Sequence, residues 1–217
     1  IQIRAWDRHE VEIVAYKKVK SGSPNSARRY MNEVKIEIDD AGEAIRVHTR
    51  FPDDDEQGGG IFSWLLNLGG KNASVDYEVM VPAEFDLDVN STNGHIDIRD
   101  CQGRFALATT NGNMEADNIK GLARCKTTNG SITMTFLEVN GDDEMSFRST
   151  NGSVKLYLPE SLNAMLQART TNGNIRCDLP MHDVNKDSDR KLEAVINDGG
   201  PVIYIKTTNG TIRIYES

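Results

Sequence analysis

The chain has 217 residues, 38% of them hydrophobic and 27% charged, and its formal net charge at pH 7 is −8. This composition is typical of a folded protein, and the acidic balance argues against a general nucleic-acid binder. The longest apolar run, residues 61–68, is shorter than the ~20 residues that a transmembrane helix needs, so we expect no transmembrane segment. Three cysteines, Cys101, Cys125 and Cys177, are too few for a disulfide scaffold and are expected to be small core residues.

The first 73 residues carry no repeat and are predicted to form an N-terminal β cap. Alternation of apolar and polar residues predicts strands at 1–6, 11–16, 34–38 and 44–47, and a short helix is expected at 26–32. Such a cap would protect the open strand edge at the end of a repeat array.

An insertion at about residues 52–72 interrupts this cap. It starts with an acidic, glycine-rich stretch and continues with the apolar run 61–68. We expect the run to cover an end or flank of the array, because a monomer seldom leaves a large contiguous apolar patch in water. The alternative is that Phe62, Trp64 and Leu65 project as an apolar contact for a partner or a membrane surface.

Residues 74–217 carry an internal repeat. The tripeptide Thr-Asn-Gly occurs six times, with its glycines 18, 18, 22, 21 and 37 residues apart, and each copy follows a Ser or Thr. Apolar residues two and four positions after every glycine, and at alternate positions before it, predict one strand on each side of the tripeptide. The long last interval holds an insertion at residues 181–191.

Two all-β architectures fit this spacing. An antiparallel β meander or sandwich would use Asn-Gly as hairpin turns. A single-stranded β-helix, or β-solenoid, would stack each copy as one rung ~4.8 Å from the next. We favour a β-solenoid of about six to seven rungs, because stacked Asn amides and Thr hydroxyls can bond the next rung at a corner whose backbone is otherwise unsatisfied. The predicted ladder consists of Asn93, Asn111, Asn129, Asn151, Asn172 and Asn209 with Thr92, Thr110, Thr128, Thr150, Thr171 and Thr208.

Three elements of the chain are typical of one bacterial family. They are the stretch from Ile3 to Arg8, the stretch from Val75 to Val79 followed by Val81-Pro82, and the repeated Thr-Thr-Asn-Gly. On these elements the whole chain resembles the putative-adhesin family of β-repeat proteins. The resemblance implies a β-solenoid and an extracytoplasmic location behind a removed signal peptide or anchor, and it names no catalytic residue.

Asp97 and Glu115 are the best candidates for catalysis. They occupy equivalent outward positions in adjacent rungs, which would place their carboxyl groups roughly 5 Å apart, near the separation of a retaining glycosidase pair. A polysaccharide lyase or glycosidase on a β-helix scaffold is therefore the alternative function. We favour the simpler interpretation that Arg99 and Asp117 give diagonal ion pairs on a solvated sheet.

Residues 183–189 place oxygen ligands at alternate positions, as a calcium loop does. Ser188 stands where that loop needs Gly, and Ala194 stands where it needs Glu. We therefore interpret the segment as an acidic surface loop and predict neither a metal nor a cofactor.

The charges are unevenly distributed along the chain. Residues 1–119 hold 13 Lys and Arg against 21 Asp and Glu, whereas residues 120–217 are balanced. Four residues before the repeat glycine, the last four copies carry an outward cation, and stacking would align these cations on one face. Such a row favours an anionic partner, unless acidic neighbours neutralise it on a solvated face. The four cations are Lys126, Arg148, Arg169 and Lys206.

These patterns predict a non-enzymatic binding or structural module of the cell envelope or cell surface. Its flat β faces would meet a glycan or a protein of the envelope, or a second copy of the chain. A fold alone does not determine a function, so this hypothesis depends on the candidate residues named above.

Overall fold

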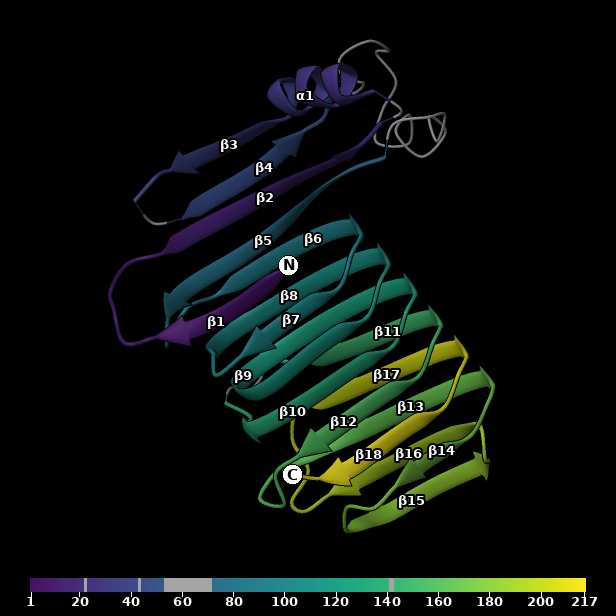
Figure 1. The fold of residues 1–217 in the computed structure, drawn as a ribbon. Coiled ribbons are helices and arrows are strands. Elements are labelled where there is room, and N and C mark those ends of the chain that lie inside the picture. Colours follow the sequence, from purple (N-terminus) through teal and green to yellow (C-terminus); the bar gives the residue numbers. More distant parts are fainter. Residues whose placement is uncertain (22, 43, 53–71, 141–142) are drawn as a thin grey trace. The chain divides into compact units, whose positions relative to one another are not determined.

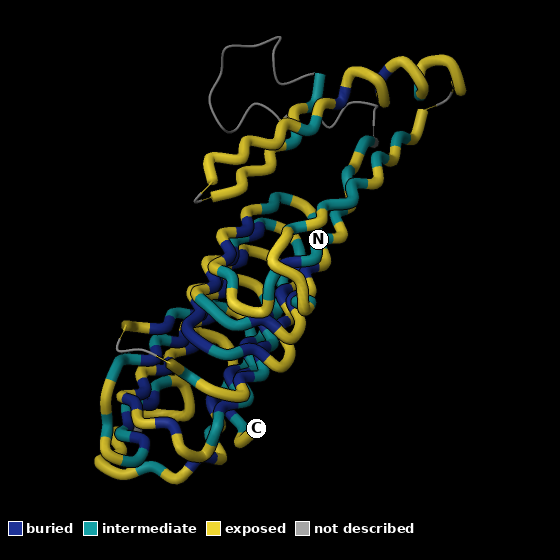
Figure 2. Tube along the Cα trace, turned by 90° about the vertical axis from the view of Figure 1, so that its left-hand side faces the viewer, coloured by how far each residue is buried: buried dark blue, intermediate teal, exposed yellow. Residues whose placement is uncertain are grey.

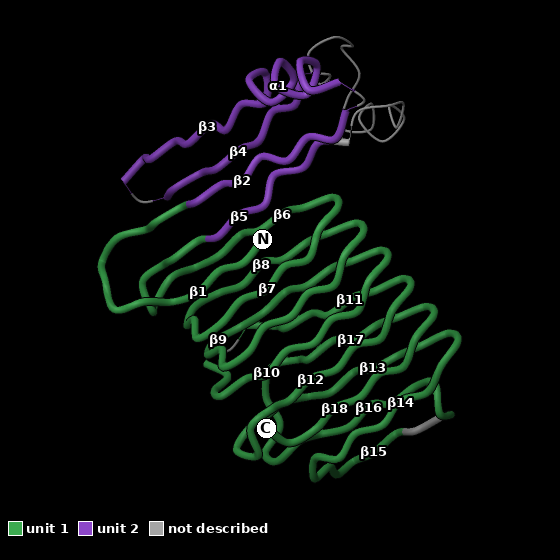
Figure 3. Tube along the Cα trace, in the orientation of Figure 1, with its two compact units in different colours: residues 1–13, 79–217 green, residues 14–78 purple. Residues whose placement is uncertain are grey.

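The computed structural model describes residues 1–21, 23–42, 44–52, 72–140 and 143–217 (Figure 1). The chain divides into two compact units, one of residues 1–13 and 79–217 and the other of residues 14–78 (Figure 3). Phe62, Trp64 and Leu65, which were predicted to cover the array or to contact a partner, lie outside the described residues.

The smaller unit contains the elements expected for the cap. Strand β2 (Glu12–Lys20) pairs with β5 (Asn72–Pro82), and β3 (Lys35–Asp40) forms an antiparallel hairpin with β4 (Ile45–Arg50). Helix α1 (Pro24–Glu33) buries Tyr30. The predicted strands and the predicted helix of this region are confirmed, with bounds that differ by a few residues.

The larger unit is a β-solenoid with two walls, which confirms the predicted fold class. Its rungs pair in parallel, so the alternative of an antiparallel meander is wrong. Wall A is built of the strands that precede the six Asn-Gly corners, namely β6 (Leu87–Asn93), β8 (Gln102–Asn111), the second half of β9 (Met114–Asn129), β11 (Met145–Asn151), β17 (Val202–Asn209) and β13 (Ala164–Asn172). The antiparallel strand β16 (Lys191–Ile196), which lies outside the repeat, continues this wall beside β13. Wall B is built of β1 (Gln2–Trp6), β7 (Ile96–Arg99), the first half of β9, β10 (Ile132–Glu138), β12 (Val154–Leu158), β18 (Ile212–Glu216) and β14 (Ile175–Cys177).

The order of the rungs departs from the order of the chain. Strand β17 pairs with β11 on one side and with β13 on the other, and β18 likewise lies between β12 and β14. The C-terminal rung is therefore inserted between the fourth and fifth copies of the repeat (Figure 1). At the other end, β1 pairs with β7, so residues 1–6 belong to wall B rather than to the cap that was expected over residues 1–73.

The segment that was interpreted as an acidic loop is an edge strand. Residues Met181–Ser188 form β15, which pairs antiparallel with β16, and β16 pairs antiparallel with β13 at the end of wall A. The 181–191 insertion is thus the start of a hairpin that covers the last rung of this wall.

Inward side chains of both walls form one core, and Figure 2 marks the buried residues in dark blue along the chain. The residue two positions after the repeat glycine is fully buried in five rungs, and Phe136 meets Phe147 edge to face at 6.3 Å. Each large apolar side chain that is buried in this way stabilises the fold by about 1.5–3 kcal/mol. The five residues are Ile96, Met114, Ile132, Val154 and Ile212.

The Asn-Gly corners stack so closely that only glycine fits. A Cβ atom on Gly130 would lie 1.9 Å from the carbonyl oxygen of Gly112, and the equivalent distance for Gly210 and the oxygen of Gly152 is 2.1 Å. No side chain can accept such a distance, so the glycine of the repeat is required by the stacking itself.

The six corner asparagines form one continuous ladder. Five of the amide nitrogens donate to the Oδ1 atom of the preceding rung at 2.7–2.8 Å, and Asn93, which begins the ladder, only accepts. The ladder follows the spatial order of the rungs, which is Asn93, Asn111, Asn129, Asn151, Asn209 and Asn172.

The predicted threonine ladder is displaced by one residue. The threonines of the tripeptide (Thr92, Thr110, Thr128, Thr150, Thr171 and Thr208) are exposed or half-buried and face outward. The preceding Ser or Thr faces inward, and its hydroxyl donates to the carbonyl oxygen of the corner glycine in the adjacent rung at 2.7–3.4 Å. The donors are Thr109, Thr127, Ser149, Thr170 and Thr207, all of them buried.

We predict that Asn129→Ala lowers the free energy of unfolding by ~1–3 kcal/mol, because it leaves groups on both neighbouring rungs unpaired. Asn93→Ala at the end of the ladder removes one bond rather than two and should cost less. Chemical denaturation measures both. A loss at Asn129 no larger than that of the exposed control Asn25→Ala would contradict the ladder.

The displaced hydroxyls can be tested with two adjacent substitutions of the same kind. Thr170→Val should cost about 1–3 kcal/mol, because the shape is kept and the buried carbonyl oxygen of Gly210 loses its 2.9 Å hydrogen bond. Thr171→Val alters an exposed side chain and should leave the melting temperature nearly unchanged. Equal effects of the two substitutions on the free energy of unfolding would mean that the inward hydroxyl does not stabilise the fold.

The three cysteines are unpaired, and Cys101 and Cys125 are buried. Burial raises the pKa of the Cys101 thiol to about 11, and burial also raises the pKa of Cys125 and of Cys177. At pH 8 a thiol of pKa about 11 carries roughly a hundredfold less thiolate than one of pKa about 9.

We therefore expect Cys101 and Cys125 to resist a thiol-specific disulfide reagent at pH 8 in the folded protein. All three cysteines should react at once in denaturant. Rapid reaction of Cys101 or Cys125 in the folded state would show that this part of the core opens readily.

Candidate functional site

The predicted cations lie in one row across wall A, together with a fifth that sequence reasoning missed. Arg148 is in register with Lys126 on one side and with Lys206 on the other, and Arg169 follows Lys206. The antiparallel strand β16 then places Lys191 beside Arg169. Row A therefore reads Lys126, Arg148, Lys206, Arg169 and Lys191.

Most of row A has no anionic partner. Lys191 forms an ion pair with Glu193 at 3.1 Å, and the Arg148 guanidinium lies 4.9 Å from the centre of the Tyr204 ring. Lys126, Arg169 and Lys206 are exposed and form no ion pair with another described residue. In water, two charges ~4 Å apart repel by about 1 kcal/mol, which long, flexible side chains reduce further, so the fold tolerates the row.

The other end of wall A is acidic. A groove of about 320 Å³ lies over β6, β8 and β9, and its charged lining residues are four acids and two arginines, namely Asp86, Asp88, Asp143 and Glu144 with Arg104 and Arg124. Arg104 donates to Asp143 at 3.1 Å in the same groove. Wall A thus changes from acidic at its first rungs to cationic at its last rungs.

Asp97 and Glu115 are register neighbours on wall B, as their spacing predicted. The Asp97 carboxylate, however, accepts two hydrogen bonds from Arg99, at 3.0 and 3.2 Å, and it is largely buried. Glu115 lies 3.9 Å from His95. Arg99 therefore pairs with Asp97 within its own strand, rather than diagonally across the strands as the sequence suggested.

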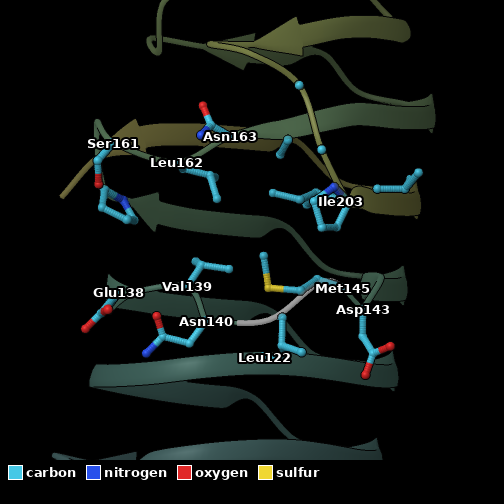
Figure 4. Close-up of a pocket in the computed structure, with 16 residues that line it drawn as sticks. Leu122, Glu138, Val139, Asn140, Asp143, Met145, Ser161, Leu162, Asn163 and Ile203 are labelled. Atoms are coloured by element: carbon cyan, nitrogen blue, oxygen red, sulfur yellow. The ribbon is translucent and has the colours of Figure 1, made fainter.

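A larger cavity of about 510 Å³ lies at the ends of the rungs opposite the Asn corners (Figure 4). Apolar residues such as Leu122, Met145 and Ile203 line it together with Glu138 and Asp143. Figure 4 shows these two carboxylates on opposite sides of the cavity, and Asp143 is paired with Arg104.

Among the residues that the structure describes, no group of three or more His, Cys, Asp and Glu side chains could hold a metal ion. Likewise, none of the helices in the described ranges is long and apolar enough to cross a membrane.

Comparison with known proteins gave three results. A crystal structure of a putative cell adhesion protein from Clostridium sporogenes superposes with a TM-score of 0.49 at 12% sequence identity, covering 100% of this chain and 88% of that one. No curated protein sequence matches the chain. The family model named Toastrack DUF4097 matches residues 68–215, which comprise most of the chain and nearly all of the solenoid. The chain therefore belongs to the Toastrack DUF4097 family.

Proposed function

We propose that the solenoid is a non-enzymatic binding module of the cell envelope or cell surface, and that row A holds an acidic polysaccharide. The observation that carries this proposal is the row itself, in which five cations lie on adjacent strands and four form no ion pair within the described chain. Adjacent strands are ~4.8 Å apart, so the row offers evenly spaced positive charges to a linear polymer with regularly spaced carboxylates.

The aromatic and hydroxyl groups around row A suit a carbohydrate. Tyr204 lies beneath Arg148, and Ser146 and Gln167 flank Tyr204 in register on the same outward face. Tyrosine combines an apolar ring with a hydroxyl that donates and accepts hydrogen bonds, and the other two side chains add donors and acceptors. These groups can contact the faces and hydroxyls of sugar rings between the charged contacts.

An extracytoplasmic location fits this role, because acidic polysaccharides are components of cell envelopes. The alternative function, cleavage of a polysaccharide by Asp97 and Glu115, rests only on their neighbouring positions in wall B. The ion pair of Asp97 with Arg99 favours binding without cleavage.

We expect the protein to bind polygalacturonate but not neutral dextran. Binding should weaken between an ionic strength of about 0.01 M, where the Debye length is about 30 Å, and about 0.15 M, where it is about 8 Å. Arg148→Glu/Arg169→Glu should weaken binding about tenfold or more at low salt, since two favourable charge contacts become repulsive. Calorimetry or biolayer interferometry measures the affinity.

The matched control is Arg4→Glu/Arg28→Glu, which makes the same change in net charge at two exposed arginines that are not members of row A. Its affinity should stay close to that of the wild type. Failure of the wild type to bind at low salt, or equal affinity of both double variants, would contradict the proposal. Release of new reducing ends during incubation would instead establish the enzymatic alternative.

A further inference from the structure

Wall B carries a second row of cations behind row A. Three strands of this wall place Lys155, Arg213 and Arg176 in register, in that order. Each of them follows a member of row A by seven residues, across the Asn-Gly corner: Lys155 follows Arg148, Arg213 follows Lys206, and Arg176 follows Arg169. The same three rungs therefore present a cation on both walls.

The middle residue of this second row, row B, contains an unsatisfied donor. The Nε atom of Arg213 is buried and has no hydrogen-bond partner in the structure. Its neighbours in register are Lys155 and Arg176, both cationic, and none of the three forms an ion pair with a described residue. The Nε atom itself is closed off from solvent, so a carboxylate placed over the half-buried Arg213 would accept hydrogen bonds from the terminal Nη groups of its guanidinium and offset three positive charges.

An aromatic pair lies beside row B. Tyr157 and Tyr215, two residues beyond Lys155 and Arg213 on the same strands, stack with their ring centres 5.0 Å apart and their planes inclined by 20°. Neither hydroxyl bonds to another described residue, so both are available to sugar hydroxyls. A simple inorganic anion would contact only the cations, whereas a charged sugar could contact both the cations and the tyrosines.

The same column of wall B is acidic at its other end. From Gln2 it runs through Asp97, which is paired with Arg99, and then through Glu115 and Thr133 before it reaches row B. Within this column an anionic chain is therefore attracted only to the last three rungs, which also carry row A.

We propose that row B is a second site for an acidic polysaccharide, centred on Arg213, so that one solenoid binds two polymer chains and links them. This proposal rests on the function proposed for row A. Two walls of one solenoid face away from their common core, so a flat lipid surface could meet only one of them, whereas separate polymer chains can occupy both.

The first experiment isolates row B by binding. The row A variant Arg148→Glu/Arg169→Glu should retain weak, salt-dependent binding to polygalacturonate at low salt. Adding Arg176→Gln and Arg213→Gln should reduce that binding to the level of neutral dextran, whereas adding the charge-matched pair Arg4→Gln and Arg28→Gln should not. Adding Arg176→Gln alone to the row A variant should give an intermediate loss of binding. This variant keeps the half-buried Arg213, so it still tests row B if substitution of Arg213 unfolds the protein.

The second experiment detects linking. Wild-type protein that is monomeric by light scattering should make a solution of long polygalacturonate turbid, and excess polymer should clear it. Variants in either row should bind without turbidity. In a ¹H–¹⁵N spectrum of the arginine side chains, the Nε–H signal of Arg213 should shift when a short galacturonate oligomer is added.

The outcomes separate the two proposals. No binding by the wild type overturns the function itself. Binding by the wild type that disappears entirely in the row A variant, or residual binding that is insensitive to Arg176 and Arg213, overturns row B and leaves the proposed function intact. An unshifted Arg213 signal at saturating oligomer would also overturn row B.

Discussion

The close stacking of the Asn-Gly corners is the constraint on which the rest of this structure depends. A Cβ atom at a stacked corner glycine would come within 1.9–2.1 Å of the carbonyl oxygen of the adjacent corner, so no other residue fits there. The asparagine and the inward hydroxyl before it then bond to that adjacent rung. Once the corners are fixed in this way, every residue at a constant distance from the glycine is aligned with its counterparts in the neighbouring rungs.

Alignment of this kind turns a repeated residue into a continuous row on the surface. Outward positions are free of the packing constraints that fix the core, so their chemistry can vary without cost to the fold. Neighbouring cations repel by about 1 kcal/mol or less in water, whereas each large core residue contributes about 1.5–3 kcal/mol. The scaffold can therefore hold rows of like charge that an isolated sheet would not maintain.

The corner motif and strand alternation were sufficient to predict the parallel solenoid, the asparagine ladder and the members of row A except Lys191. The spatial order of the rungs was not predictable, because every corner is chemically the same and any rung can stack on any other. Lys191 was missed because it lies on an antiparallel strand outside the repeat. The sequence prediction assigned the hydroxyl ladder to the threonines of the tripeptide, one residue after the side chains that form it. The alternation of the strand already directed Thr170 inward and Thr171 outward.

The inserted C-terminal rung connects this unexpected order to the proposed sites. In chain order, β17 and β18 would lie at the end of the stack, with Lys206 and Arg213 on edge strands. In the observed order both strands are paired on both sides, so Lys206 lies between Arg148 and Arg169, and Arg213 lies between Lys155 and Arg176. The insertion of the C-terminal rung between two other rungs thus completes both rows.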